Sequence, residues 1–172
     1  LGGMAGYFGW EGSPRPERWV ISESSSQTRF IFDGAITVGG LAGRAAKVRI
    51  SQSWAESAMA PEQLRRWGGL VGLLVGDGDV AQNLPSIENC YASLGVLSVR
   101  DQDVGGLVGL TQQEVILRTS YANLEVEGST NNSGGLVGRV TGANSRLDRL
   151  FFAGRRADMS RALFGTIPSP DV

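Results

Sequence analysis

The chain has 172 residues, of which 25 are glycine, and its formal net charge is −1. Glycine reaches about twice its usual share, but no Gly-X-Y period runs through the sequence, which excludes a collagen triple helix. The nearly balanced charge argues against nucleic acid as a partner, because such binding domains carry a basic excess. No run of about 18 apolar residues occurs, so we expect no membrane span.

Histidine is absent, and cysteine occurs once, at Cys90. These counts exclude a Ser-His-Asp triad, a Cys-His pair, histidine-ligated zinc and an internal disulfide. The chain opens with Leu-Gly-Gly and shows no signal sequence or lipidation motif. We therefore interpret it as a mature or excised piece of a longer protein.

A glycine-rich pentapeptide recurs along the chain and divides it into units. Its third residue is Met or Leu, its fourth is apolar and its fifth is glycine. The copies are Gly2–Gly6, Gly39–Gly43, Gly68–Gly72, Gly105–Gly109, Gly134–Gly138 and a degenerate Arg161–Gly165, with starts 37, 29, 37, 29 and 27 residues apart. These copies hold 16 of the 25 glycines, so the excess of glycine indicates an ordered repeat.

A second element, centred on an aromatic residue, lies 13 or 14 residues before the next Gly-Gly pair in the first four units. Its copies are Ser53-Trp54-Ala55, Cys90-Tyr91-Ala92, Ser120-Tyr121-Ala122 and Phe151-Phe152-Ala153, with Ser24-Ser25-Ser26 as a faded first copy. Four residues before the centre stands an apolar side chain, at Ile21, Ile50, Ile87 and Leu117. In the last unit Asp148 breaks this column, unless a one-residue bulge lets Leu147 take the place.

Each unit offers two or three short strands that are too small to bury their apolar sides alone, so they must stack on their neighbours. We predict an all-β fold, a parallel β-helix of about six coils, which is right-handed because parallel crossovers nearly always are. The glycines suit a tight corner or a close backbone approach. Residues 1–165 form one domain with repeats starting near 2, 39, 68, 105, 134 and 161, and 166–172 is a tail or linker.

The eight-residue difference between long and short units falls between the pentapeptide and the second element. The variable segments Tyr7–Val20 and Leu73–Ser86 are therefore predicted to leave the stack as loops. The segment Pro61–Trp67 has proline at its start, arginines near its end and Gly68 after it, which predicts one short helix. Binding usually resides on loops held by a rigid frame, so these three segments are the expected contact surfaces.

Paired carboxylates on two turns are the candidate metal ligands. They are Asp77, Asp79, Asp101 and Asp103. Oxygen ligands on turns suit calcium, but neither turn matches an EF-hand or the nonapeptide of calcium-loaded β-rolls. Solvated aspartates are the favoured interpretation, calcium bridging the two turns is the alternative, and no other cofactor is expected.

Three further features each have a functional and a structural interpretation. The segment Arg139–Arg161 holds six arginines and two aspartates and suits either an acidic partner or a solvated flank, and we favour the flank. Cys90 stands in a column of small residues and is expected to be inward rather than reactive. The aromatic residues Trp54, Tyr91, Tyr121 and Phe152 suit a sugar platform, but a core or corner stack is the stronger expectation.

The Gly-Gly-Leu-Val-Gly pentapeptide, with the segment Asn89-Cys90-Tyr91-Ala92, resembles the GLUG motif of bacterial surface proteins. The resemblance spans Gly2 to Gly165 and is clearest at 68–72, 105–109 and 134–138. The motif occurs in large adhesins resembling filamentous haemagglutinin and in non-catalytic regions of IgA-specific metallopeptidases. It implies an exported, repetitive, β-rich stalk or passenger with no catalytic residues. The first and last units depart from it, since Ser25 replaces the aromatic and Arg161-Ala162 replaces Gly-Gly.

We therefore expect a non-enzymatic structural or adhesive segment of an exported bacterial surface protein, located outside the cell or at its surface. Its expected partner is a host-surface or matrix protein or a glycan. One alternative is a solenoid that stacks on further copies of itself in an extracellular filament. The other is a β-helix enzyme acting on polysaccharide, which requires two carboxylates about 5–9.5 Å apart.

Overall fold

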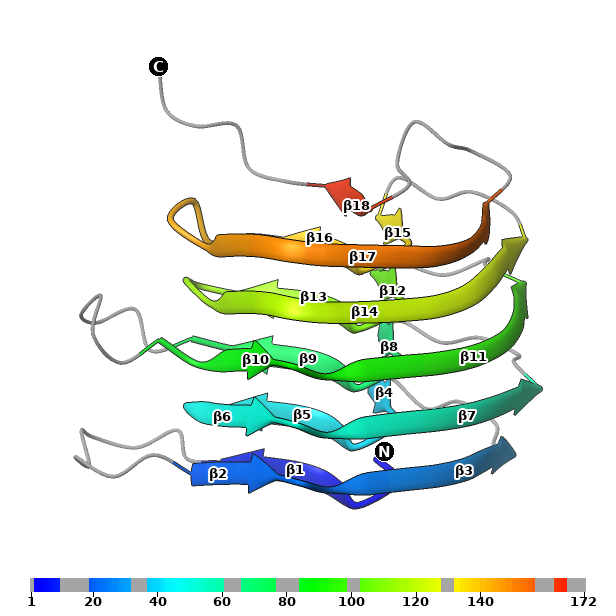
Figure 1. The fold of residues 1–172 in the computed structure, drawn as a ribbon, viewed down its shortest axis with the longest axis horizontal. Helices are drawn as coiled ribbons and strands as arrows, with labels where there is room; N and C mark the ends of the chain where they lie inside the picture. The colour runs from blue at the N-terminus through cyan, green and yellow to red at the C-terminus, as the bar shows by residue number, and fades with distance from the viewer. Residues whose placement is uncertain are drawn as a thin grey trace.

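The computed structural model describes residues 2–9, 19–31, 37–60, 66–76, 84–98, 103–127, 132–156 and 163–166. Within these ranges the chain is all-β, and its strands pair in parallel in three sheets. One passage of the chain through these sheets is called a rung below. Figure 1 shows the rungs stacked one above another, from β2 and β3 at one end to β17 near the other. This arrangement fits a parallel β-helix.

Each sheet collects the equivalent strands of successive rungs. The first sheet has the order β1 (Ala5–Gly9), β5 (Ala42–Ala46), β9 (Val71–Val75), β13 (Val108–Gln112), β16 (Val137–Val140) and β18 (Phe164–Thr166). The long sheet contains β2 (Trp19–Ser22), β6 (Val48–Ser51), β10 (Ser86–Glu88), β3 (Ser25–Ile31), β7 (Trp54–Ala60) and β11 (Tyr91–Ser98), joined by β14 (Ile116–Glu127) and β17 (Arg146–Arg156). The third sheet has β4 (Thr37–Gly39), β8 (Arg66–Gly68), β12 (Val104–Gly105) and β15 (Ser133–Gly134).

The pentapeptide forms the corner between the third sheet and the first. Gly68 ends β8, Val71 begins β9, and the side chain of Leu70 between them is fully buried. The amide of Leu70 donates to the carbonyl of Leu107 on the next rung at 2.9 Å. A Cβ on Gly68 would collide with the Val71 carbonyl group. The predicted close approach of backbones is therefore confirmed, and it explains why the corner requires glycine.

The predicted apolar column of the long sheet is also confirmed. Its members pair in register from rung to rung and are buried: Ile21, Ile50, Ile87 and Leu117. They belong to one hydrophobic cluster with the corner leucines Leu41, Leu70, Leu107 and Leu136. In the last unit Leu147 pairs with Leu117, so this column continues, half-buried, to the fifth rung.

The alignment predicted for the last unit is wrong by one residue. Phe151, rather than Phe152, pairs with Tyr121, and Phe152 pairs with Ala122. The equivalent triplet is thus Leu150-Phe151-Phe152, and this alignment needs no bulge, because Leu147 precedes Phe151 by four positions. Large apolar side chains here replace the small ones of earlier rungs, and Leu150 and Phe152 pack, half-buried, against the end of the core.

Each rung of the long sheet bends at one residue in the left-handed region. These residues are Glu23, Gln52, Asn89, Thr119 and Arg149, with φ between 48° and 54°. The bend breaks the normal alternation of a strand, in which residues two apart share a face. Ile50 and Ala55 both face the core, and Trp54, four residues after Ile50, is only partly buried. The bend therefore moves the aromatic column to the outer face.

No helix occurs within the described ranges, and the helix predicted over 61–67 is wrong at its end. Arg66 and Trp67 lie in β8, where Trp67 pairs with Val38 and Val104 and is fully buried. Burial of the indole in the stacked core outweighs the local helix signals. Positions 61–65 lie outside the described residues, and so do 10–18 and 77–83 of the predicted loops. The outer parts of those loops are strand: 7–9 in β1, 19–20 in β2, 73–75 in β9 and Ser86 in β10. Thr166, which was expected to begin the tail, ends β18.

Candidate functional site

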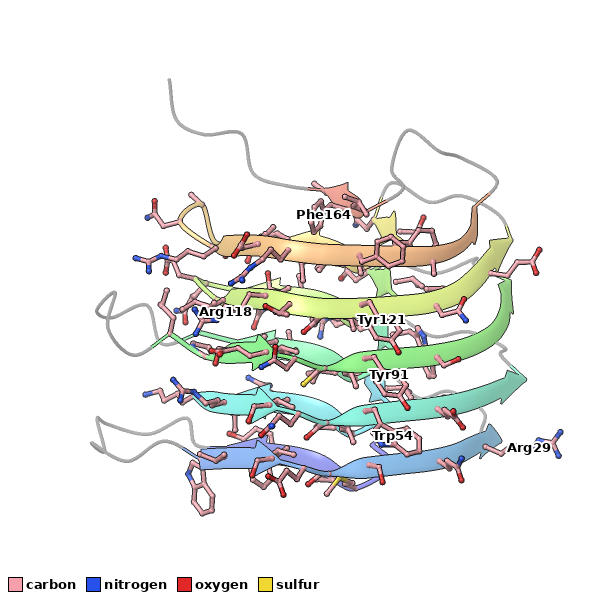
Figure 2. The ribbon with its side chains drawn as sticks, in the orientation of Figure 1. Arg29, Trp54, Tyr91, Arg118, Tyr121 and Phe164 are labelled. Carbon is pink, nitrogen blue, oxygen red and sulfur yellow. The ribbon has the colours of Figure 1, made fainter. Side chains whose placement is uncertain are left out.

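Three aromatic side chains stack on the outer face of the long sheet. The ring centroids of Trp54 and Tyr91 are 5.6 Å apart and those of Tyr91 and Tyr121 are 5.1 Å apart, with 6° between the planes in both pairs. Parallel pairing of β7, β11 and β14 places the three residues directly opposite one another. Figure 2 shows the three side chains one above another along the stack. We call them the aromatic ladder.

The ladder lies on the surface rather than in the core. Trp54 and Tyr91 are half-buried, and Tyr121 is 43% exposed. The expectation of a core stack is therefore wrong, because the bend at each rung turns these residues outward. Phe151 continues the column next to Tyr121 and is 65% exposed. Phe152, the residue expected in this column, packs against the core instead.

The stacking geometry limits what the ladder can bind. Adjacent rings cover each other's faces, so the ring edges and the tyrosine hydroxyls face the solvent. A sugar ring packs on an aromatic face, and within the ladder such faces remain at its ends, on Trp54 and Tyr121. Beside Trp54 the column is filled only by the small Ser25. Along the flank, the Gln27 amide donates to the Glu56 carboxylate at 2.8 Å.

The pKa of Tyr91 lies above its ordinary value. Partial desolvation is the largest cause, and the neighbouring Tyr121 and Glu56 add to it because negative charge near a phenol disfavours its ionised form. The ladder therefore presents neutral phenols at neutral pH. Its surface is aromatic and uncharged, with a carboxylate on one side.

A buried carboxylate with two arginines occupies the corner beside β12. Asp103 is 2% exposed, and its Oδ2 lies 2.9 Å from Arg139 Nη2 and 3.7 Å from Arg66 Nε. Oδ1 has no hydrogen-bond partner within the described part of the chain. Burial raises the pKa of Asp103, and the two arginines oppose that rise without cancelling it. The cluster joins three successive rungs, since Arg66, Asp103 and Arg139 belong to the third, fourth and fifth.

The structure separates the calcium candidates. Asp77, Asp79 and Asp101 lie outside the described residues, and calcium there stays a prediction. Asp103 is not the solvated aspartate that we expected, because guanidinium groups supply the positive charge beside it. The described ranges contain no group of three or more Asp, Glu, His or Cys side chains placed to hold a metal ion.

Cys90 is buried, as predicted, and takes part in a ladder of small polar side chains. Its thiol lies 3.2 Å from the Glu88 carbonyl, and its amide donates to Ser120 Oγ at 3.1 Å. Ser53 Oγ makes equivalent contacts, donating to the Ser51 carbonyl and accepting from the Ser24 amide. Burial raises the pKa of the Cys90 thiol to about 11. These side chains bond the backbone at the bend, a role that the sequence signals only as a column of small residues.

The arginines of the segment 139–161 do not all point to one partner. Arg139 pairs with buried Asp103 from the first sheet, whereas Arg149 pairs with exposed Asp148 at 3.0 Å on the long sheet. On the same sheet Arg118 pairs with Glu88 at 2.8 Å. These pairs favour the interpretation of a solvated flank.

Comparison of the chain with known protein families, curated proteins and solved structures gives no match. Within the described residues there is no helix of the length and apolar character needed to cross a membrane.

Proposed function

We propose that the chain is a segment of a right-handed β-solenoid whose rigid frame displays variable loops, without enzymatic activity. On this proposal it belongs to the GLUG-motif repeat regions of exported bacterial surface proteins. It lies outside the cell or at its surface and contacts a host-surface or matrix protein or a glycan through its loops. The supporting residues are the glycine corners and the in-register columns, which make each rung a copy of the last.

The observation that carries this proposal is that the length of one connection varies while the register of the frame does not. Between β5 and β6 only Lys47 intervenes, whereas between β9 and β10 the chain inserts 76–85. Ile87 of β10 nevertheless pairs in register with Ile50 on one side and Leu117 on the other. A frame that accepts an insert without moving is suited to display, because binding usually resides on loops of a fixed scaffold.

Loop replacement tests the proposal. One variant replaces 77–83 with a Gly-Ser dipeptide, and a matched variant replaces 10–18 in the same way. Binding of each to a glycan array and to immobilised matrix proteins is compared with wild type, while circular dichroism and thermal unfolding report on the frame. We expect at least one variant to lose binding with an unchanged unfolding transition. If wild type binds nothing, or both variants bind like wild type, the adhesive proposal fails.

Self-stacking is a second candidate because apolar side chains are exposed at both ends of the stack. They are Met4, Tyr7, Trp19 and Val20 in the first rung and Phe151 and Leu163 at the other end. Open strand edges invite pairing with another chain. The ends are out of phase, however: β18 already covers β16 in the first sheet, whereas no described strand covers β17 in the long sheet. Sedimentation across a range of concentrations tests this candidate, and a monomer throughout overturns it.

The polysaccharide-enzyme alternative gains no supporting observation within the described ranges. The carboxylates there with printed partners bond arginine or glutamine rather than facing each other: Glu56, Glu88, Asp103 and Asp148. It stays a prediction from the sequence, and a screen for glycan turnover tests it.

A further inference from the structure

Tyr91 and Tyr121 form a pair whose geometry is set by the parallel sheet. They are directly opposite on β11 and β14, which pair in register, and successive strands lie about 4.8 Å apart. Their rings are stacked, with centroids 5.1 Å apart and 6° between planes. Both face outward, and Tyr121 is 43% exposed (Figure 2). A small oxidant or an oxidising enzyme therefore has access to this pair.

The rest of the chain makes the pair distinctive. The sequence holds three tyrosines, and the third, Tyr7, lies on β1 in a different sheet, where Arg44 lies over its ring at 6.0 Å from the centroid. Trp54 covers the far face of the Tyr91 ring, with centroids 5.6 Å apart, and so restrains it. Tyr91 and Tyr121 are therefore held together as neighbours, with no need for a chance encounter.

We propose that Tyr91 and Tyr121 are a site of oxidative cross-linking, at which a peroxidase using hydrogen peroxide joins the two rings as dityrosine. The inference stands on the geometry of the aromatic ladder and is independent of the proposed scaffold function. It assigns a covalent modification to residues that the display of loops does not use.

The reaction balances as follows. Each phenol loses one electron and one proton, which leaves a tyrosyl radical with unpaired spin on the oxygen and on the two Cε carbons. One Cε of Tyr91 bonds to one Cε of Tyr121, and each ring then moves its Cε hydrogen to the phenolic oxygen and becomes aromatic again. Hydrogen peroxide accepts the two electrons and two protons and leaves as two molecules of water. The protein loses two hydrogen atoms in total.

Stacking favours this product over links between molecules. Two groups held in contact react at an effective concentration far above that of free partners in solution. The new bond joins the third rung to the fourth across 30 residues of chain, counted from 91 to 121. A cross-link of this kind restricts the unfolded chain, so the cross-linked protein melts at a higher temperature.

The experiment treats the folded protein with horseradish peroxidase and hydrogen peroxide. We expect blue dityrosine fluorescence in the monomer, a mass loss of two hydrogen atoms, and one linked peptide pair containing 91 and 121 after proteolysis. The yield per molecule stays constant on dilution, because the reaction is intramolecular. Protein unfolded in urea gives much less of this product.

Variants separate the site from general tyrosine oxidation. Tyr91→Phe and Tyr121→Phe keep a stacking ring but lack a phenol, so each abolishes the monomeric product, whereas Tyr7→Phe leaves it unchanged. Circular dichroism confirms that all three variants are folded. The proposal is overturned if the wild-type monomer shows no dityrosine, if Tyr121→Phe retains it, or if dityrosine appears only in dimers whose yield falls on dilution.

Discussion

Arg139 Nη2 lies 2.9 Å from Asp103 Oδ2, although the two residues are 36 positions apart and belong to different sheets. The first sheet contributes the arginine through β16, and the turn before β12 contributes the aspartate at a φ of 57°. The contact ties the fourth rung to the fifth at a corner where the backbone is already closely packed. Its energetic effect depends on whether the arginines offset the burial of the carboxylate.

The raised pKa of Asp103 predicts how this corner responds to pH. Between the ordinary value of 3.8 and the raised folded value, the folded protein binds the proton and the unfolded chain does not. Stability therefore falls as pH rises through that window. We expect the stability difference between wild type and Asp103→Asn to shift against wild type over the same range. Urea unfolding at a series of pH values measures it.

Asp148→Asn is the matched control for this measurement. Its carboxylate pairs with Arg149 but is 61% exposed, and interactions of exposed charges are weak. Its stability difference from wild type should therefore change less with pH. A wild-type advantage over Asp103→Asn that grows between about pH 4 and 7 contradicts the prediction, since it would mean that the arginines outweigh the burial.

Cys90 is predicted to resist alkylation while the protein is folded. Its pKa of about 11 keeps the thiol protonated at pH 8, and burial denies access to reagents. Iodoacetamide followed by mass spectrometry should show almost no labelling in buffer and full labelling in urea. The double variant Cys90→Ser/Ser93→Cys is the control, because position 93 lies outside the core and should be labelled in the folded state. Labelling of folded wild type at the rate of that control would show that Cys90 is accessible.

The columns and corners of this fold could be predicted from the sequence because each repeats at a constant spacing. The Ile50–Ile87–Leu117 column and the glycine corners needed only the alignment of units with one another. The local helix signals before Gly68 were misleading, because the column that buries Trp67 extends across rungs and leaves no trace in a window of seven residues.

The direction of the aromatic ladder could not be predicted, for a physical reason. A spacing of four in a regular strand places Ile50 and Trp54 on one face, and only the positive φ at Gln52 separates them. Residues such as Gln, Thr and Arg carry no sequence signal for that conformation. Likewise, the run Leu150-Phe151-Phe152 is apolar throughout, so two alignments one residue apart fit equally well until the strand pairing is known. The Asp103–Arg139 pair is visible only once the rungs are stacked.

The pentapeptide glycines should not tolerate even one added methyl group. A Cβ on Gly106 would meet the Gly135 carbonyl oxygen, Ala122 Cβ and Leu124 Cδ2. Because the obstacles include backbone of the next rung, Gly106→Ala should destabilise the protein by about 3 kcal/mol or more. Gly6→Ala is the control, since nothing lies within 4 Å of a Cβ there, and it should be neutral or stabilising by up to about 1 kcal/mol. Equal unfolding free energies for the two variants would refute the close-approach explanation.

The bend residues offer a reciprocal exchange between two rungs. Thr119 is exposed and β-branched at a φ of 48°, whereas Asn89 holds the equivalent position at 54°. Asparagine tolerates the left-handed region better than threonine. Thr119→Asn should therefore stabilise the protein by about 0.5–1 kcal/mol, and Asn89→Thr should destabilise it by a similar amount. Chemical denaturation measures both. Because both side chains are exposed, lost packing cannot explain opposite signs, and two changes of the same sign would show that the left-handed bend does not determine stability at these positions.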